Sequence, residues 1–189
     1  MERSDAELMK AFAEGETGAL GEIISRYGAP LYGYLLRLSG SPETASDLFQ
    51  DVFVKLARTP KAYGERYKFS AWLFTVAHHA AMDHFRRRSA RKAETLDGDG
   101  SDPGLLSRLI SPEPGPAASA QNRELKSAIE KALEHLCPDQ REIFYLRHYS
   151  GLTFKEIAAL LKIPIGTALA RVSRAAAALR KELEKNGVQ

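Results

Sequence analysis

The sequence contains few of the residues on which most enzymes and metalloproteins depend. Cys137 is its only cysteine among 189 residues, which excludes an internal disulfide and a cysteine-based zinc finger. No apolar run approaches the roughly 20 residues that a membrane-spanning helix requires. The N-terminus, MERSDAELMKAFAEG, is too charged for a secretory signal. We therefore expect a cytoplasmic protein.

Catalytic motifs are missing as well. The chain has no Ser-His-Asp arrangement, no glycine loop of the kind that cradles phosphate, and no HExxH. His79 and Asp83 are four residues apart and could chelate a metal, with His78 and His84 nearby, but no third ligand falls on their helix face. A metal-dependent enzyme built on these residues is one alternative. We expect no enzyme activity, no metal, no cofactor and no small-molecule substrate.

What the sequence does contain is helical periodicity and unevenly distributed charge. Its hydrophobic content of 44% suffices for globular cores, and its net charge is +3. Basic and acidic residues number 14 and 11 in residues 1–93, 1 and 5 in residues 94–116, and 12 and 8 in residues 117–189. Two mildly basic ends that flank an acidic middle suit two nucleic-acid-binding modules, although ordinary solvated helices give similar counts.

The N-terminal part has a helical pattern throughout. Apolar residues recur every three or four positions over residues 8–38, and Gly40 is placed to end the second helix. A Ser-Pro pair then predicts a third helix over residues 42–58. We expect a loop with interleaved aromatic and basic side chains at residues 59–68, followed by a fourth helix that Ser70 caps.

The C-terminal end has the pattern of a helix-turn-helix. Thr153 and Glu156 form a capping box at the start of one helix, and Pro164 stops that helix. Thr167 is expected to cap a second helix after a short turn at residues 163–166. Two short helices in this arrangement suit a reader of the DNA major groove, whereas the alternative is a helical hairpin with a solvated basic face.

Residues 94–120 are rich in Gly, Pro, Ser and Asp, which is the composition of a linker. An apolar island at residues 105–110 is suited to docking on a partner. Since the chain has no internal repeat, we expect an all-α fold of two small helical domains joined by a flexible linker. The expected domains are residues 1–93 and residues 121–189, the second containing the helix-turn-helix.

Two further clusters indicate contact with nucleic acid. The arginine run at residues 86–88, with Arg91 and Lys92 just beyond, exceeds what a helix end needs to complement its dipole. The loop at residues 61–69 combines aromatic and basic side chains, as proteins that hold unpaired bases do, although such a loop also suits ordinary packing.

In this order, the segments resemble the extracytoplasmic-function sigma factors, small two-domain members of the main bacterial sigma family, over almost the whole chain. DLFQDVFVKLAR is similar to the core-polymerase-binding helix of that family, and FSAWLFTVAHHAAMDHFRRR to its promoter-melting and minus-ten-reading helix. The segment from LCPDQ to LRKEL is similar to the domain that reads the minus-thirty-five element. The resemblance implies an alternative sigma factor that directs bacterial RNA polymerase to specific promoters and assists their melting.

The resemblance also implies partners and site residues. The partners are core RNA polymerase, promoter DNA as duplex and as melted non-template strand, and an anti-sigma factor, often membrane-anchored. The residues implied to contact core polymerase are Asp47, Gln50, Asp51 and Phe53. Those implied for the minus-ten element and melting are Lys61, Tyr63, Tyr67, Phe69, Trp72, His79, Asp83, Arg86 and Arg87. Those implied for the minus-thirty-five element are Thr167, Leu169, Arg171, Ser173 and Arg174.

Two departures from the family pattern affect recognition. His79 stands where the family usually has Asn, and Leu169 and Ala170 stand where Lys or Arg and then Ser are common. We therefore expect little direct hydrogen-bond readout by the second helix, with Leu169 against a thymine methyl and DNA shape supplying the rest. The other alternative is a one-component or two-component regulator. It would need a ligand pocket or phosphoacceptor near the N-terminus, for which the sequence has no motif.

Overall fold

The computed structural model describes residues 3–64, 68–94, 129, 132–133 and 135–185. Throughout these ranges the regular structure is helical, which confirms the predicted fold class. The helices are α1 (Asp5–Ala13), α2 (Thr17–Ser39), α3 (Pro42–Arg58), the 3-10 turn η1 (Pro60–Ala62), α4 (Phe69–Glu94), α6 (Pro138–Ser150), α7 (Phe154–Leu161) and α8 (Ile165–Lys185). The predicted linker, apart from its first residue, lies outside the described ranges.

Local sequence chemistry sets the ends of α1, α2 and α3. α1 begins after Ser4, whose side chain accepts a hydrogen bond from the Glu7 N–H, while the Glu7 carboxylate accepts one from the Ser4 N–H at 2.7 Å. α2 ends at Gly40, which adopts the left-handed conformation with φ 68°. α3 begins after Ser41, whose hydroxyl caps it, and its bounds coincide with the predicted 42–58.

α4 begins earlier than predicted. The Trp72 N–H donates to the Lys68 carbonyl at 3.2 Å, so both Phe69 and Ser70 lie in the first turn. The reason is tertiary, because the Phe69 ring is 2% exposed and packs among other aromatic rings, which holds this turn against the core. The prediction that Ser70 caps the helix is therefore wrong.

The predicted helix-turn-helix is present, with a tighter turn. Thr153 caps α7 through the expected capping box with Glu156. Lys162 ends α7 in the left-handed conformation with φ 55°, two residues before Pro164. The Thr167 N–H donates to the Pro164 carbonyl at 2.9 Å, so α8 begins directly after the proline. Thr167 lies inside the first turn, and the prediction that it caps the helix is wrong.

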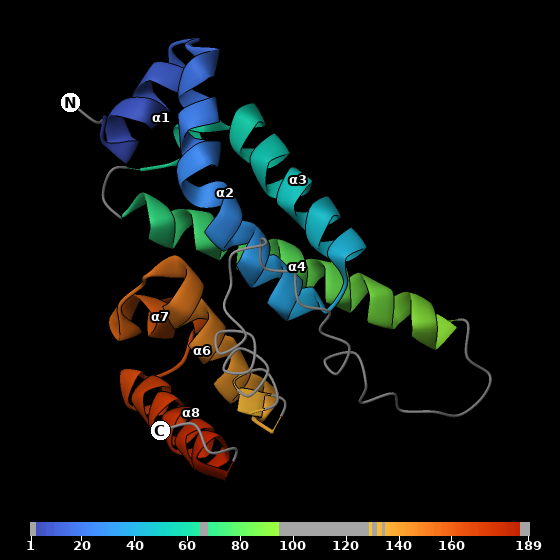
Figure 1. The fold of residues 1–189 in the computed structure, drawn as a ribbon. Coiled ribbons are helices and arrows are strands. Elements are labelled where there is room, and N and C mark those ends of the chain that lie inside the picture. Colours follow the sequence, from blue (N-terminus) through green and yellow to red (C-terminus); the bar gives the residue numbers. More distant parts are fainter. Residues whose placement is uncertain (1–2, 65–67, 95–128, 130–131, 134, 186–189) are drawn as a thin grey trace, which may run out of the picture.

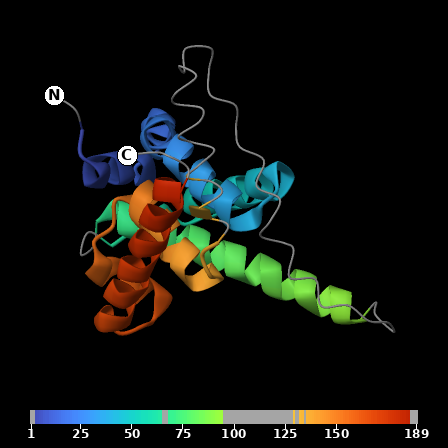
Figure 2. The same cartoon turned by 60° about the horizontal axis from the view of Figure 1, so that its bottom comes forward.

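The helices form two packed groups that also touch each other. α2 packs against α1, α3 and α4 in the N-terminal group (Figure 1). In the C-terminal group, α6 packs against α7 and α8, and it also packs on α2 and α4. Figure 2 shows the C-terminal half of α4 extending beyond the other helices, where other molecules can reach it. Of the helices in the described ranges, none combines the length and apolarity that a membrane span needs.

Buried side chains of both groups belong to one hydrophobic core cluster. In the N-terminal group, Tyr34 and Phe74 are fully buried, with ring centroids 5.5 Å apart. In the C-terminal group, Ala168, Ala175 and Leu179 of α8 are buried at helical spacing. The outer surfaces of α3, α4 and α8 are left for contacts with partners.

Candidate nucleic-acid and protein interfaces

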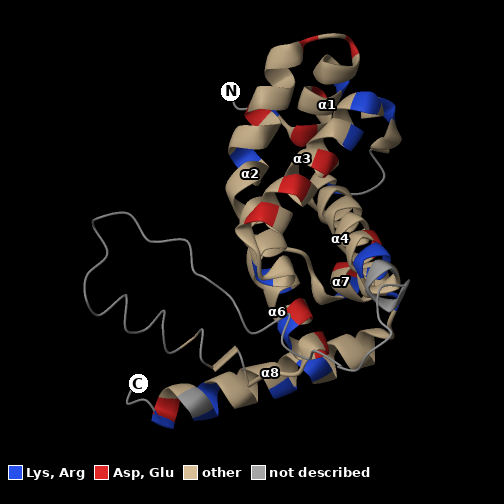
Figure 3. Ribbon diagram, turned by 90° about the vertical axis from the view of Figure 1, so that its right-hand side faces the viewer, with Lys and Arg blue, Asp and Glu red and all other residues tan. Residues whose placement is uncertain are grey.

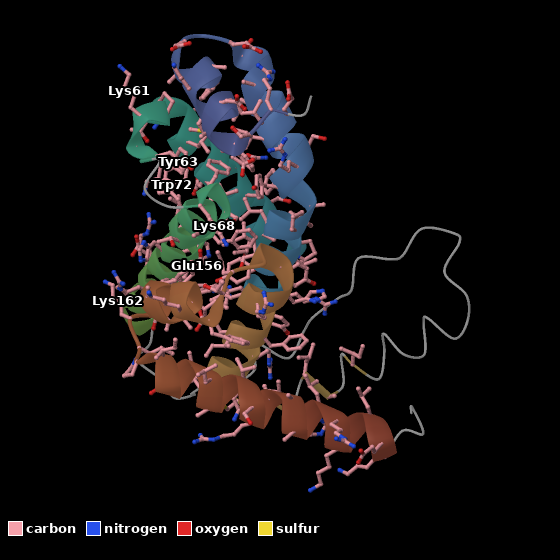
Figure 4. The ribbon with its side chains drawn as sticks, turned by 90° about the vertical axis from the view of Figure 1, so that its left-hand side faces the viewer. Lys61, Tyr63, Lys68, Trp72, Glu156 and Lys162 are labelled. Carbon is pink, nitrogen blue, oxygen red and sulfur yellow. The ribbon has the colours of Figure 1, made fainter. Side chains whose placement is uncertain are left out.

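Four aromatic side chains converge at the start of α4, and we call Tyr27, Tyr63, Phe69 and Trp72 the aromatic cluster. The Phe69 ring centroid lies 5.3 Å from that of Tyr27 and 5.2 Å from that of Tyr63. The Trp72 centroid lies 5.8 Å from that of Phe69 and 5.9 Å from that of Tyr63. Tyr63 and Trp72 are half-buried, and Figure 4 shows them near exposed Lys61. Unpaired bases stack on such partly open rings beside a cation.

Tyr27 is a member of the cluster that sequence reasoning missed. Its hydroxyl donates a hydrogen bond to the Asp5 carboxylate at 2.5 Å, and Arg26 forms an ion pair with the same carboxylate. Burial raises the pKa of Tyr27 above its ordinary range, and the hydrogen bond to Asp5 raises it further. Helical spacing marks Tyr27 only as part of an apolar stripe, and the packing of α2 on α4 brings it to the cluster.

The segment before α4 supplies only part of the predicted contact set. Lys61 is exposed in η1, and Tyr67 lies outside the described residues. Phe69 requires a correction, because its buried ring supports the cluster from the core instead of facing a ligand. Trp72 packs on that ring with part of its own surface open.

Beyond the cluster, α4 carries an exposed polar surface, the α4 face, made of His79, Asp83, Arg86 and Arg87. These positions share one side of the helix because they are separated by three, four, seven or eight residues, or are adjacent. The Arg86 guanidinium lies 3.1 Å from the Asp83 carboxylate, and Arg87 Nε donates to the Asp83 backbone carbonyl at 3.2 Å. A guanidinium has five N–H donors, so such a contact leaves others for phosphate oxygens.

The surroundings of His79 favour its neutral form. Partial desolvation lowers its pKa most, and the nearby His78, Lys162 and Lys55 lower it further, while Asp83 opposes them. A neutral imidazole has one hydrogen-bond donor and one acceptor. An asparagine amide also has both a donor and an acceptor. A neutral His79 therefore offers both a donor and an acceptor on the exposed α4 face.

The outer face of α3 is polar and acidic (Figure 3). The exposed members of the predicted set are Asp47, Gln50 and Asp51. Phe53 requires a correction, because its ring is 7% exposed and packs against that of Phe49 with the centroids 4.8 Å apart. The apolar contribution to this surface comes from Val54, which is 47% exposed and which sequence reasoning missed.

On α8 the predicted residues point in two directions. Leu169 is 47% exposed, and Ser173 and Arg174 are exposed with it. The Arg171 side chain is only 25% exposed, and its Nη2 lies 2.5 Å from Oδ2 of Asp139 in the first turn of α6.

Helical spacing explains this difference. Arg171 lies three residues after Ala168 and four before Ala175, which are both buried, so it points toward the side of α8 that packs on the other helices. Half-buried Thr167 lies on the same side. In this arrangement Arg171 ties α8 to α6, whereas the side chain of Arg174 is exposed.

The histidines do not form a metal site with other residues in the described ranges, where no three side chains of the ligand types converge. His78 is 8% exposed, and its Nδ1 contacts Tyr34 and Glu142. His79 points to the exposed α4 face instead.

Two family descriptions match the chain, one for each helical group. Sigma-70 region 2 matches residues 23–91, which include the aromatic cluster and the α4 face. Sigma-70, region 4 matches residues 126–179, which include the helix-turn-helix.

Known relatives are similar over almost the whole length. The RNA polymerase sigma factor CarQ of Myxococcus xanthus is 30% identical over 175 residues, which cover 93% of this chain and 95% of CarQ. The ECF RNA polymerase sigma factor SigW of Bacillus subtilis is 26% identical over 186 residues, which cover 97% of this chain and 98% of SigW. Among solved structures, the sigma factor RpoE of Bartonella quintana, in complex with the anti-sigma factor NepR, has a TM-score of 0.68 at 27% identity. That comparison covers 87% of this chain and 96% of RpoE.

Proposed function

The chain belongs to the extracytoplasmic-function (ECF) RNA polymerase sigma factors, and from that premise we propose how its surfaces share the work of transcription initiation. As an alternative sigma factor it directs bacterial RNA polymerase to promoters and assists their melting, under the control of an anti-sigma factor. Its proposed action is binding alone, since polymerase supplies the chemistry. Its proposed place of action is the cytoplasm, and its proposed domains are residues 1–93 and 121–189 with a linker at 94–120.

The main support for a role in promoter melting is the aromatic cluster, which lies next to the α4 face. The partly open rings of Tyr63 and Trp72 offer stacking worth about 1–3 kcal/mol per base to an unpaired strand. Lys61 adds a cation at the rim, and the arginines of the α4 face continue the path along the phosphates. These contacts stabilise the opened non-template strand relative to the duplex.

α8 is proposed to lie in the major groove at the minus-thirty-five element. Arg174 and Ser173 are exposed for contacts with phosphates and base edges, and Leu169 for a thymine methyl. Since Arg171 is held by Asp139, direct readout is thin and DNA shape supplies part of the specificity.

The outer face of α3 is proposed to bind core polymerase. It presents Asp47, Gln50 and Asp51 around exposed Val54, which is the arrangement of a polar rim around an apolar contact. Phe53 and its neighbour Phe49 support this surface from the core.

In vitro transcription with core polymerase on a randomised promoter library tests the proposed function. We expect the transcribed templates to share two short elements at a constant spacing upstream of the start site. Transcription no greater than that of core polymerase alone, or templates without shared elements, would contradict the proposal.

A binding measurement with labelled protein tests the role of α3 separately. Asp51→Ala should weaken assembly with core polymerase by about 1 kcal/mol, or roughly fivefold. Glu14→Ala removes an exposed acid at the end of α1 and serves as the control, with unchanged affinity expected. Equal affinities of the two variants would contradict the assignment.

A further inference from the structure

Asp5, in the first turn of α1, holds the hydroxyl of Tyr27 on α2. The Tyr27 hydroxyl donates a hydrogen bond to Oδ2 of Asp5 at 2.5 Å, and Arg26 forms an ion pair with Oδ1 of the same carboxylate. Arg26 also donates to the Arg3 backbone carbonyl at 2.9 Å. All of these side chains are partly buried, where hydrogen bonds to a charged group are stronger than in water. The hydroxyl end of Tyr27 is therefore fixed to α1.

The ring end of Tyr27 backs the aromatic cluster. Its centroid lies 5.3 Å from that of Phe69, which is 2% exposed and on which the half-buried rings of Tyr63 and Trp72 rest. Close-packed side chains pass a displacement on to their neighbours. A shift of Tyr27 would therefore move Phe69 and, through it, the two rings that are open to a ligand.

A second set of contacts connects Asp5 to the other side of the cluster. α1 packs against η1, which carries Lys61 and directly precedes Tyr63. Because Asp5 fixes the start of α1 to α2, it also fixes the support of η1. Tyr63 is in addition near enough to Tyr27 to raise the pKa of the Tyr27 hydroxyl, although burial and Asp5 raise it more. Asp5 thus acts on the cluster through Tyr27 and through η1.

Neighbouring ion pairs also join the two ends of this region, but they lie at the surface. Arg3 contacts Glu16 at 2.8 Å and also pairs with Glu22 on α2. Glu16 and Glu22 are exposed, so these pairs contribute little to stability. Asp5 differs from them because the ring of its partner Tyr27 belongs to the aromatic cluster.

We propose that Asp5 and Tyr27 are positioning residues of the single-strand site, and that their hydrogen bond holds the cluster in the arrangement that leaves Tyr63 and Trp72 open to an unpaired base. Rings that are already in place lose little freedom when a base binds, so affinity rises although Asp5 does not touch the base. The consequence for DNA rests on the proposed melting function. The positioning itself is a property of the protein and is measured without DNA.

Trp72 is the only tryptophan of the chain, so its fluorescence reports on the cluster alone. Tyr27→Phe removes only the hydroxyl and Asp5→Ala only its acceptor, and in both variants acrylamide should quench Trp72 more strongly than in the parent chain. Asp5→Asn keeps an acceptor oxygen and should restore the quenching of the parent chain. Glu22→Gln breaks a neighbouring surface ion pair and is the matched control, with unchanged quenching. Urea unfolding verifies that all four variants are folded.

Binding of a single-stranded oligonucleotide to the complex with core polymerase tests the consequence for the base. The oligonucleotide carries the minus-ten element that the promoter library selects, and a series of versions each lacks one base. Tyr27→Phe and Asp5→Ala should weaken binding of the intact oligonucleotide roughly fivefold, as when about one molecule in five keeps the binding arrangement. On the version that lacks the stacked base, both variants should bind as the parent chain does. Asp5→Asn should bind both versions as the parent chain does.

Quenching equal to that of the parent chain in both Tyr27→Phe and Asp5→Ala would overturn the positioning. The same loss of affinity with and without the base would overturn it as well, because a merely structural role weakens both alike. Increased quenching with undiminished affinity would overturn the consequence for base binding. If the removal of no single base weakens binding to the parent complex, the proposed melting function fails, while the quenching still decides whether Asp5 and Tyr27 position the cluster.

Discussion

The two helical groups prepare their nucleic-acid contacts in different ways. In the N-terminal group, Tyr27 and Trp72 come from different helices and meet in one aromatic cluster that is partly buried and partly open. In the C-terminal group, α8 is rich in alanine, and one of its two central arginines is held by Asp139. The exposed side chains that remain for DNA are few and lie on a single helix.

In the N-terminal group the same residues are expected to serve stability and recognition, whereas on α8 different residues serve them. The aromatic cluster is part of the core, so a change in it affects the folding of the N-terminal group and, under the proposed function, the binding of bases. On α8, the stripe that packs and the side that faces outward are distinct, so stability and DNA affinity can be changed independently. Four predictions test this contrast, beginning with the largest effect.

Trp72→Ala should lower the free energy of unfolding by about 3 kcal/mol, because the ring packs on Phe69 and Tyr63. It should also weaken binding to a single-stranded minus-ten oligonucleotide, while binding to the minus-thirty-five duplex is retained. Urea unfolding and fluorescence anisotropy measure the two effects. Trp72→Phe keeps a ring and is the control. A loss of oligonucleotide binding without a loss of stability would break the contrast.

Thr153→Ala should destabilise the C-terminal group by about 1 kcal/mol through loss of the cap of α7. Burial raises the pKa of Glu156, but hydrogen bonds from the backbone and side chain of Thr153 outweigh it and lower the net pKa. A carboxyl with a lowered pKa stabilises the fold above its unfolded pKa and loses that contribution as pH falls through its folded pKa. The difference between the parent chain and the variant should therefore shrink in acid, as thermal unfolding at several pH values would show. A difference that grew in acid would contradict this account.

Arg174→Ala and Arg171→Ala should separate DNA affinity from stability on α8. Arg174→Ala should weaken duplex binding and reduce its salt dependence by about one counterion, with little effect on unfolding. Arg171→Ala should instead lower stability by at most about 1 kcal/mol, because its partner Asp139 is partly exposed. The double variant Arg171→Ala/Asp139→Ala should lose less stability than the two single variants lose in sum. Additive stability effects would exclude the coupling between Arg171 and Asp139.

The smallest expected effect concerns the pKa of His79, measured by NMR titration. Lys162 is one of the groups that lower this pKa. Lys162→Gln removes this positive charge, so the pKa should rise toward its ordinary value, whereas Lys181→Gln, at an exposed position on α8, should leave it unchanged. A pKa that is the same in both variants would show that α7 does not lie next to α4 in solution.

Helix ends were predictable where neighbouring residues make the cap. Gly40 and the pair Thr153 and Glu156 act within one turn, so their effect is independent of the rest of the chain. Ser70 and Thr167 have the right side chains for capping but lie inside helices. The buried ring of Phe69 holds the first turn of α4 over Ser70. The Pro164 carbonyl accepts a hydrogen bond from the Thr167 N–H, which extends α8 over Thr167.

The sequence predicted which helices carry the candidate site, but it did not predict which of their side chains face outward. The resemblance pointed to α3, α4 and α8, while Phe53 and Phe69 turned out to be buried supports. Tyr27 and Val54 carried no local signal, since a half-buried ring and an exposed valine have the same spacing as core residues.

The sequence by itself determined the helices, the two groups and the family, because periodicity, caps and motif order are properties of adjacent residues. Only the tertiary structure decided that Tyr27 joins the aromatic cluster, that Arg171 is held by Asp139, and that α6 docks on Gly33. Each of these contacts joins segments far apart in the chain. Their partners depend on the direction in which packing turns a side chain, which no local pattern specifies.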